Sequence, residues 1–80
     1  MTRAFAETAL APLRETPVLL TTLRVYLEAG SSVTEAANIL GVHRNTLTAR
    51  LQSIRQQLEV DLTDASQRLA LQVACRALQT

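Results

Sequence analysis

The sequence predicts an all-α fold of about five helices, on three observations. Hydrophobic residues make up 48% of the 80 residues, while Gly and Pro occur only twice each and aromatic residues reach 2%. Ala, Leu, Gln and Arg are abundant, a composition that favours helices over sheets. Apolar residues also recur at helical spacing in successive segments. A chain of this length forms one domain, and its core is so small that a partner subunit would add to its stability.

The first fifteen residues are interpreted as a linker or a short N-terminal helix, and residues 16–80 as the domain proper. Residues 3–14 have apolar positions at helical spacing, but Pro12 interrupts the pattern because proline breaks a helix interior.

A longer helix is predicted to begin at Thr16 and Pro17 and to end at Gly30. Proline has no N–H to lose at the first helical position, and a threonine before it can cap the free donors of the first turn. Glycine readily takes the left-handed conformation that ends a helix. One apolar stripe is expected to face the core: Leu19, Leu20, Leu23, Tyr26 and Leu27.

Two helices separated by a very short turn come next. Ser32 and Glu35 have the spacing of a capping box, and the helix of about two turns that follows is predicted to end at Gly41. A second helix then runs to about residue 58, with one apolar face: Leu47, Leu51, Ile54 and Leu58. This arrangement is expected of a helix-turn-helix, with the small Ala37 where the two helices approach and Val42 filling the corner. An ordinary αα-hairpin in a bundle is the alternative.

The last helix is predicted over residues 67–79, after a second capping box formed by Asp64 and Gln67. It is apolar nearly all round, so it must be covered on more than one side. Either it is central to the fold or it meets a second subunit.

The outward face of the helix after the turn favours DNA binding over a plain hairpin. Counted at ~100° per residue from the apolar face, four side chains point away from the core: Asn45, Ala49, Gln52 and Gln56. A solvated face is usually rich in Glu and Lys, but this one offers Arg, Asn, Thr and Gln, which hydrogen-bond base edges or phosphates. The net charge is only +1, yet Arg44, Arg50 and Arg55 lie in a segment without an acid.

Residues at the turn each have a structural alternative to contact with DNA. Arg44 is the first candidate for a base or phosphate contact, because its guanidinium can bind guanine bidentately. Asn45 reads adenine or bonds the local backbone. Thr46 bonds within the first turn or reaches a phosphate, and His43 caps the helix or touches a phosphate.

Three candidates lie further from the tip. Ser32 and Thr34 either cap the shorter helix or present its N-terminus to a phosphate. Arg50 either contacts a phosphate or pairs with Glu59 or Asp61.

No enzymatic, cofactor, metal or membrane role is expected. The chain has no Gly-rich phosphate loop and no nucleophile paired with a base, and His43 has no second ligand at metal-binding spacing. Cys75 is the one cysteine and lies in an apolar segment, so it should pack in the core of a protein from a reducing compartment. No apolar run approaches ~18 residues, and we expect a cytoplasmic protein.

Three stretches together resemble the C-terminal helix-turn-helix domain of the PucR/CdaR transcription regulators. They are LLTTLRVYLEAGSSVTEAANIL, GVHRNTLTARL and RLALQVACRAL, and the resemblance runs from about Leu10 to Leu78. A looser similarity to the Fis-type helix-turn-helix covers residues 18–51. The resemblance implies a bacterial transcription factor with a sensor domain N-terminal to this chain, so that Met1 would be a boundary within a longer protein.

The resemblance also implies which residues meet DNA. By position in the motif, six would line the major groove: His43, Arg44, Asn45, Thr48, Ala49 and Gln52. The other candidate DNA contacts are Thr46, Arg50, Ser32 and Thr34. The chain departs from the family at Ala49, where an aromatic residue is usual, and at Ala65, where proline usually opens the last helix. The first bears on the preferred bases or on a packing contact, and the second on helix initiation.

The predicted function is sequence-specific binding of double-stranded DNA, with residues 44–58 as the recognition helix in the major groove. The domain would act as a homodimer on half-sites one helical turn (~34 Å) apart. The alternative is a helical protein–protein interaction or dimerisation module without its own DNA affinity. Such a module would use residues 67–79 and the stripe that begins at Leu19.

Overall fold

The computed structural model describes residues 10–79, which form one 3-10 helix and four α-helices. In chain order these are η1 (Ala11–Leu13), α2 (Pro17–Glu28), α3 (Val33–Leu40), α4 (Arg44–Leu58) and α5 (Ala65–Gln79). The all-α prediction is confirmed, and no strand occurs in this part of the chain. There is one α-helix fewer than expected, because the segment around Pro12 forms only a 3-10 turn. Most of the helix predicted over 3–14 lies outside the described residues.

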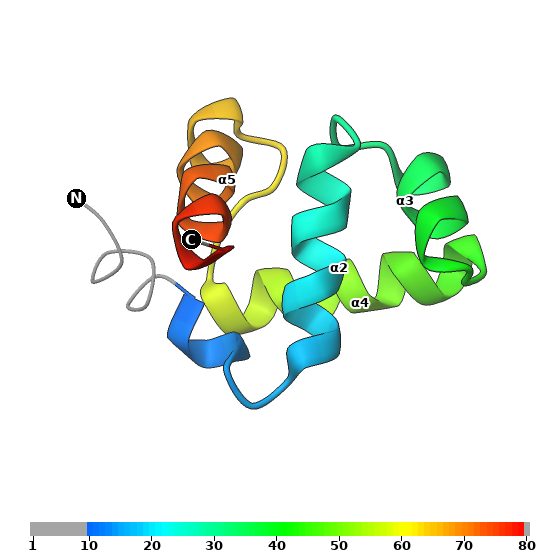
Figure 1. Ribbon diagram of the computed structural model, residues 1–80, viewed down its shortest axis with the longest axis horizontal. Helices are drawn as coiled ribbons and strands as arrows, with labels where there is room; N and C mark the ends of the chain where they lie inside the picture. Colours follow the sequence, from blue (N-terminus) through cyan, green and yellow to red (C-terminus); the bar gives the residue numbers. More distant parts are fainter. Residues whose placement is uncertain (1–9, 80) are drawn as a thin grey trace.

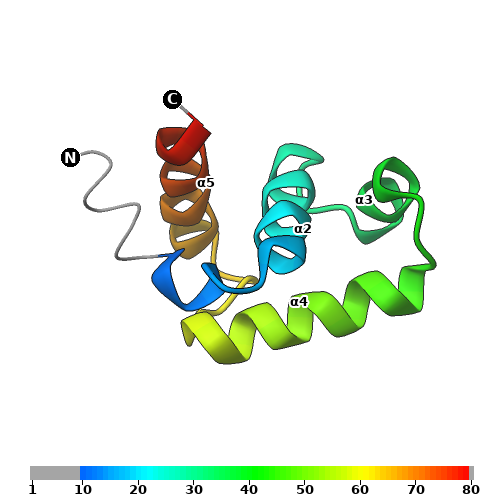
Figure 2. The same ribbon diagram turned by 60° about the horizontal axis from the view of Figure 1, so that its bottom comes forward.

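α2 is the central helix. It contacts η1, α3, α4 and α5. In Figure 1, α5 and α3 lie on either side of α2, and Figure 2 shows all three helices side by side above the long α4. Because α2 has neighbours on several sides, Val25 is buried although it lies outside the predicted stripe. Leu20 and Tyr26 of that stripe are half-buried at the edge of the core.

The core lies between α2 and α4 and is closed at one end by η1. The largest fully buried side chains come from all three elements: Leu13, Thr22, Leu23, Leu47 and Ile54. Leu10 and Leu13 are buried, so the segment before residue 16 supplies two core residues. The division of the chain at residue 16 stays a prediction.

Among residues 10–79, the main helix contact of α5 is with α2. Leu71, Ala74 and Cys75 are buried, whereas Leu69 is 61% exposed and Val73 is 45% exposed. The expectation that this helix is central is therefore wrong for this chain, and the other expectation, a second subunit, stays a prediction. No helix among residues 10–79 has the length and apolar character needed to cross a membrane.

The predicted helix ends are confirmed, but their caps form only in part. Gly30 has φ 71° and Gly41 has φ 69°, the left-handed conformation expected at both positions. Thr16 is the residue before α2, yet its side chain makes no capping bond. Its carbonyl oxygen instead accepts from the backbone N–H groups of Leu19 at 2.9 Å and Leu20 at 3.3 Å.

The two capping boxes each form their first half. Ser32 Oγ accepts from the Glu35 backbone N–H at 3.2 Å, and Asp64 Oδ1 accepts from the backbone of Gln67 at 3.2 Å. In a complete capping box, the Gln67 side chain would accept from the backbone N–H of Asp64. Instead, Gln67 Oε1 accepts from the backbone N–H of Asp61 at 2.8 Å. Gln67 thereby ties the α4–α5 loop to the start of α5.

Candidate nucleic-acid interface

α3 and α4 meet at a tight turn built on Gly41. The Gly41 backbone N–H donates to Asn38 O at 3.3 Å and the Val42 N–H donates to Ala37 O at 3.0 Å, which satisfies the last carbonyl groups of α3. Ala37 is 4% exposed and Leu47 is fully buried, so a small residue and a leucine fill the corner as predicted. The geometry of a helix-turn-helix is therefore present.

His43 caps α4 with its own ring. Its Nδ1 atom accepts from the backbone N–H of Asn45 at 2.9 Å, while its backbone is extended at φ −70° and ψ 150°. An Nδ1 that accepts carries no proton, so in the neutral ring the proton lies on Nε2. The ring is exposed, and its Nε2–H is left to donate outward.

Most of the predicted DNA contacts are exposed, either on the first half of α4 or around the turn before it. Eight of the ten candidates have exposed side chains: Thr34, His43, Arg44, Asn45, Thr46, Thr48, Ala49 and Gln52. Ser32 and Arg50 are half-buried. The candidates on α3 and on α4 lie on either side of the turn, so the fold brings both groups to one end of the molecule (Figure 2).

Several of these polar groups have no partner inside the described part of the chain. Thr48 Oγ1 donates to Arg44 O at 3.0 Å, a bond within the helix that leaves the threonine oxygen free to accept. The side chains of Arg44, Asn45 and Gln52 make no hydrogen bond or ion pair there. They are thus available to a ligand.

Arg50 points toward α2 rather than toward the tip. Its Nη1 donates to Thr22 Oγ1 at 3.5 Å, and the buried Thr22 in turn donates to Val18 O at 2.7 Å. The partners considered from the sequence, Glu59 and Asp61, are not used: the ion pair present among residues 10–79 joins Arg24 to Glu28 at 3.6 Å.

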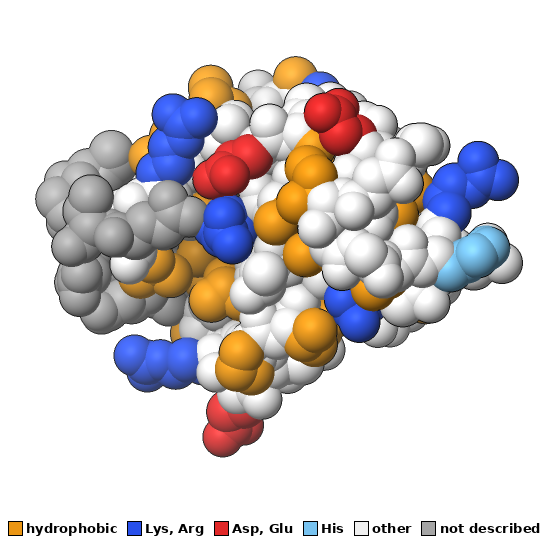
Figure 3. All heavy atoms as spheres, turned by 45° about the vertical axis from the view of Figure 1, so that its right-hand side comes forward, with side chains coloured by type: hydrophobic (Ala, Val, Ile, Leu, Met, Phe, Trp, Pro, Cys, Tyr) orange, Lys and Arg blue, Asp and Glu red, His pale blue; other side chains and the backbone are white. Residues whose placement is uncertain are grey.

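The charge along α4 changes sign from one end to the other. No acid occurs between residues 44 and 58, and Glu59, Asp61 and Asp64 follow. Two hydrogen bonds from Thr63, together with the nearby Arg55 and Arg68, lower the pKa of Asp61 from 3.8. In Figure 3 the single histidine projects at the right-hand edge beside a basic side chain, and the acidic side chains in that view lie away from it.

An open groove of about 370 Å³ runs between α3 and α4 beside the turn. Six residues line it: Thr34, Ala37, Asn38, Val42, His43 and Arg44. Asn38 was missed by the sequence interpretation, which considered only the first turn of α3. The signal that identifies it is its position four residues after Thr34, on the same face of the helix.

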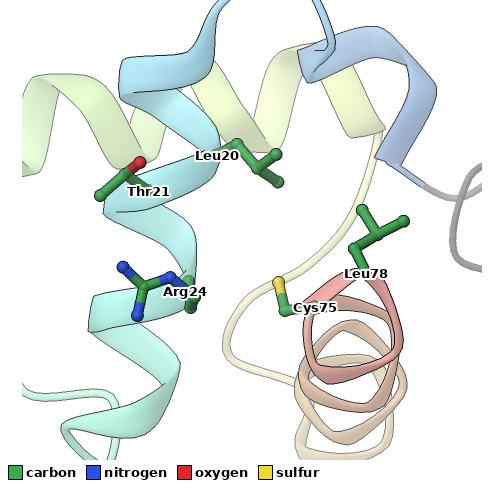
Figure 4. A pocket seen from close by; sticks show the side chains of 5 residues that line it. All are labelled: Leu20, Thr21, Arg24, Cys75 and Leu78. Carbon is green, nitrogen blue, oxygen red and sulfur yellow. The ribbon is translucent and has the colours of Figure 1, made fainter. Parts of the chain in front are cut away.

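A second hollow of about 170 Å³ lies between α2 and α5. Leu20, Thr21 and Arg24 line it from α2, and Cys75 and Leu78 line it from α5 (Figure 4). Burial raises the pKa of the Cys75 thiol to about 11, against the opposing charge of Arg24. The thiol therefore stays protonated at neutral pH and packs as an apolar group, as the sequence predicts.

Comparison with known proteins identifies the domain type. Residues 19–77 match the family model of the PucR C-terminal helix-turn-helix domain. An uncharacterised protein of Thermomonospora curvata, encoded in the 5′ region of pkwA, is 38% identical over 73 residues, which are 86% of this chain and 41% of that protein.

Two relatives from Bacillus subtilis strain 168 have named functions. The DNA-binding transcriptional activator AdeR is 38% identical over 53 residues, 66% of this chain and 13% of that protein. The purine catabolism regulatory protein is 40% identical over 63 residues, 79% of this chain and 12% of that protein. This chain thus spans less than half the length of each of these relatives. No solved structure matches it significantly.

Proposed function

Because this chain belongs to the PucR C-terminal helix-turn-helix family, we propose that it places α4 in the major groove of duplex DNA and reads base pairs there. The chain is a DNA-binding domain of a transcriptional regulator. The observation that carries the reading role of α4 is its exposed first half, which extends from Arg44 to Gln52 without an acid and with unpaired polar side chains.

The ten candidate residues fall into three groups: contacts to base edges, contacts to phosphates, and indirect contributions. Arg44, Asn45, Thr48, Ala49 and Gln52 occupy the exposed first half of α4 and would meet base edges. His43, Thr46 and Thr34 lie around the turn and would meet phosphates. Ser32 and Arg50 would contribute indirectly, because Ser32 caps α3 and Arg50 bonds to α2.

The whole protein would carry a sensor domain N-terminal to this one. Both Bacillus relatives are several times longer than the region they share with this chain, and their names describe regulators. We propose that this domain delivers the response of such a regulator to its DNA in the bacterial cytoplasm, and that it has no enzymatic activity of its own.

The domain would bind as a homodimer. Leu69 and Val73 lie four residues apart on the outer side of α5 and are largely exposed, although both are large apolar residues. A second copy is the proposed occupant, because one helix face laid against its own copy gives the self-complementary contact of a twofold dimer. Such a dimer presents two recognition helices to two half-sites.

The alternative is an interaction module that dimerises through α5 without its own affinity for DNA. It is favoured by the same exposed face of α5, but it leaves the acid-free, unpaired face of α4 without a role. The two functions differ in a single measurable property, retention of duplex DNA by the purified chain.

Selection of the 80-residue chain against a randomised duplex library, followed by sequencing of the retained DNA, tests the proposal. Enrichment of a two-part motif is expected, and the spacing of its halves would report the dimer geometry. Retention without enrichment, lost as salt rises, would mean phosphate contact alone and would contradict sequence reading. If no duplex is retained while the chain self-associates, the interaction module is correct.

A further inference from the structure

We infer that the groove between α3 and α4 holds one phosphate of the DNA backbone and that Asn38 donates a hydrogen bond to it. The inference rests on the proposed function, since it assigns a contact within the same complex. It adds a residue that neither the sequence pattern nor the family match assigns. It also gives the groove one occupant, a phosphodiester group.

The α3 side of the groove carries uncommitted polar groups above a small apolar floor. The side chains of Thr34 and Asn38 are exposed and make no hydrogen bond among residues 10–79. They lie four residues apart, so they project from one face of α3 into the same groove. Ala37 and Val42 complete the lining with small apolar side chains. The Asn38 amide offers two N–H donors to that ligand.

The α4 side supplies an oriented donor, and Arg44, whose guanidinium is proposed to meet a base edge, adds a positive charge beside the groove. Arg44 has no ion-pair partner in the described part of the chain. His43 uses Nδ1 to cap the helix, so Nε2–H is the atom that donates outward. None of the six lining residues is acidic. Donors from Asn38 and His43 thus line an open space that suits an anion with several acceptor oxygens, and the nearby charge of Arg44 makes that space more favourable for an anion.

A DNA phosphate fits this groove better than another anion because of where the groove opens. It lies beside the first turn of α4, next to the exposed residues proposed to read bases. When a recognition helix lies in the major groove, the preceding helix crosses the sugar–phosphate backbone. A phosphate contact fixes the register of the protein on the duplex but carries no sequence information. Asn38 is therefore a positioning residue.

The test compares Asn38→Ala with the unchanged chain on a duplex that contains the selected motif and on a random duplex. Asn38→Ala should weaken binding to both by the same factor, about tenfold or more, because one hydrogen bond to a charged group is lost. The preferred sequence should not change. Asn38→Asp should bind more weakly still, because a carboxylate would face the phosphate. Glu35→Ala, on the same helix but outside the groove, is the matched control and should bind within about twofold of the unchanged chain.

Single methylphosphonate groups, which remove the charge of one phosphate at a time, then locate the contact. The unchanged chain should lose affinity when one particular phosphate in each half-site is neutralised, and Asn38→Ala should lose less than the unchanged chain at that same phosphate. The melting temperature of Asn38→Ala should match that of the unchanged chain, since position 38 is exposed and alanine favours a helix.

Failure of the inference and failure of the proposed function give different results. If the unchanged chain selects a motif but Asn38→Ala binds within about twofold of it, or alters the preferred bases, Asn38 has no phosphate contact and the inference is overturned. If the unchanged chain retains no duplex at all, both fall together.

Discussion

The Nδ1 atom of His43 accepts a 2.9 Å hydrogen bond from the backbone N–H of Asn45. Both residues are candidate DNA contacts, and this bond links their roles. It satisfies one of the free donors in the first turn of α4 and fixes the ring so that Nε2–H faces outward. A single side chain thus stabilises the recognition helix and offers a donor to DNA, so its two contributions have to be separated by choice of variant.

His43→Ala and His43→Asn should separate them. Alanine removes both the cap and the outward donor, so the variant should lose about 0.5–2 kcal/mol of unfolding free energy together with DNA affinity. Asparagine is a strong capping residue and should keep the stability, but its shorter side chain does not present the Nε2–H. Urea unfolding and DNA titration of both variants check this. Equal stability of His43→Ala and the unchanged chain would contradict the capping role.

Arg44→Ala should weaken binding to the selected DNA by about 1–3 kcal/mol while the melting temperature hardly changes. The side chain is exposed and has no ion-pair partner in the described part of the chain, so the folded state loses no contact. Affinity for the selected and for a random duplex should be titrated, because a base contact is lost only on the first. Arg14→Ala removes the same charge beside η1 and is the matched control. A parallel loss of folding would make Arg44 structural.

Ala37→Leu should destabilise the domain by about 1–3 kcal/mol, because Ala37 is buried where α3 and α4 meet and a larger side chain there has to displace its neighbours. Ala37 is 4% exposed and its carbonyl accepts from Val42 in the turn. Any movement of α3 away from α4 would also reduce DNA affinity. Denaturant unfolding gives the free energy, and Glu35→Leu, an exposed position on the same helix, is the control. An unchanged stability would mean that the corner is loosely packed.

The helix boundaries could be predicted from the sequence because their signals are local. Gly30 and Gly41 have the left-handed conformation that was expected, and Ser32 and Asp64 accept the predicted backbone bonds. Each of these signals lies within four residues of the helix end that it defines, where backbone geometry alone determines the partner. The exposed face of α4 follows from helical periodicity in the same way.

Contacts between distant segments could not be predicted in this way. Arg50 bonds to Thr22, which is 28 positions away, instead of to the acids that follow α4. The central position of α2 and the exposed outer side of α5 also depend on tertiary arrangement, because periodicity gives the faces of a helix but not its neighbours. Asn38 was missed for the same reason, since its role depends on a groove that exists only after α3 and α4 have packed.

Stability should fall above pH 9 because of Cys75. Burial raises the pKa of its thiol from 9.0 to about 11, so the unfolded chain loses this proton at lower pH than the folded one. The contribution is fully present below pH 9 and disappears as the pH rises toward 11. Urea unfolding of the unchanged chain and of Cys75→Ala across this range checks the sign. Subtracting the unfolding free energy of Cys75→Ala from that of the unchanged chain removes the contribution of every other titrating group. If this difference does not change with pH, the raised pKa of Cys75 is contradicted.

Leu69→Glu should convert a dimer into a monomer without loss of folding. The side chain is 61% exposed on α5, so a carboxylate there is well solvated in the monomer, but between two copies it would meet Val73 or its own counterpart without a partner. Sedimentation equilibrium measures the assembly, and DNA titration should give weaker binding with loss of two-part site preference. Gln57→Glu adds the same charge at an exposed position of α4 and should leave the assembly unchanged. If Leu69→Glu remains a dimer, another face joins the subunits; if the unchanged chain is monomeric even on DNA, the outer face of α5 has a different partner.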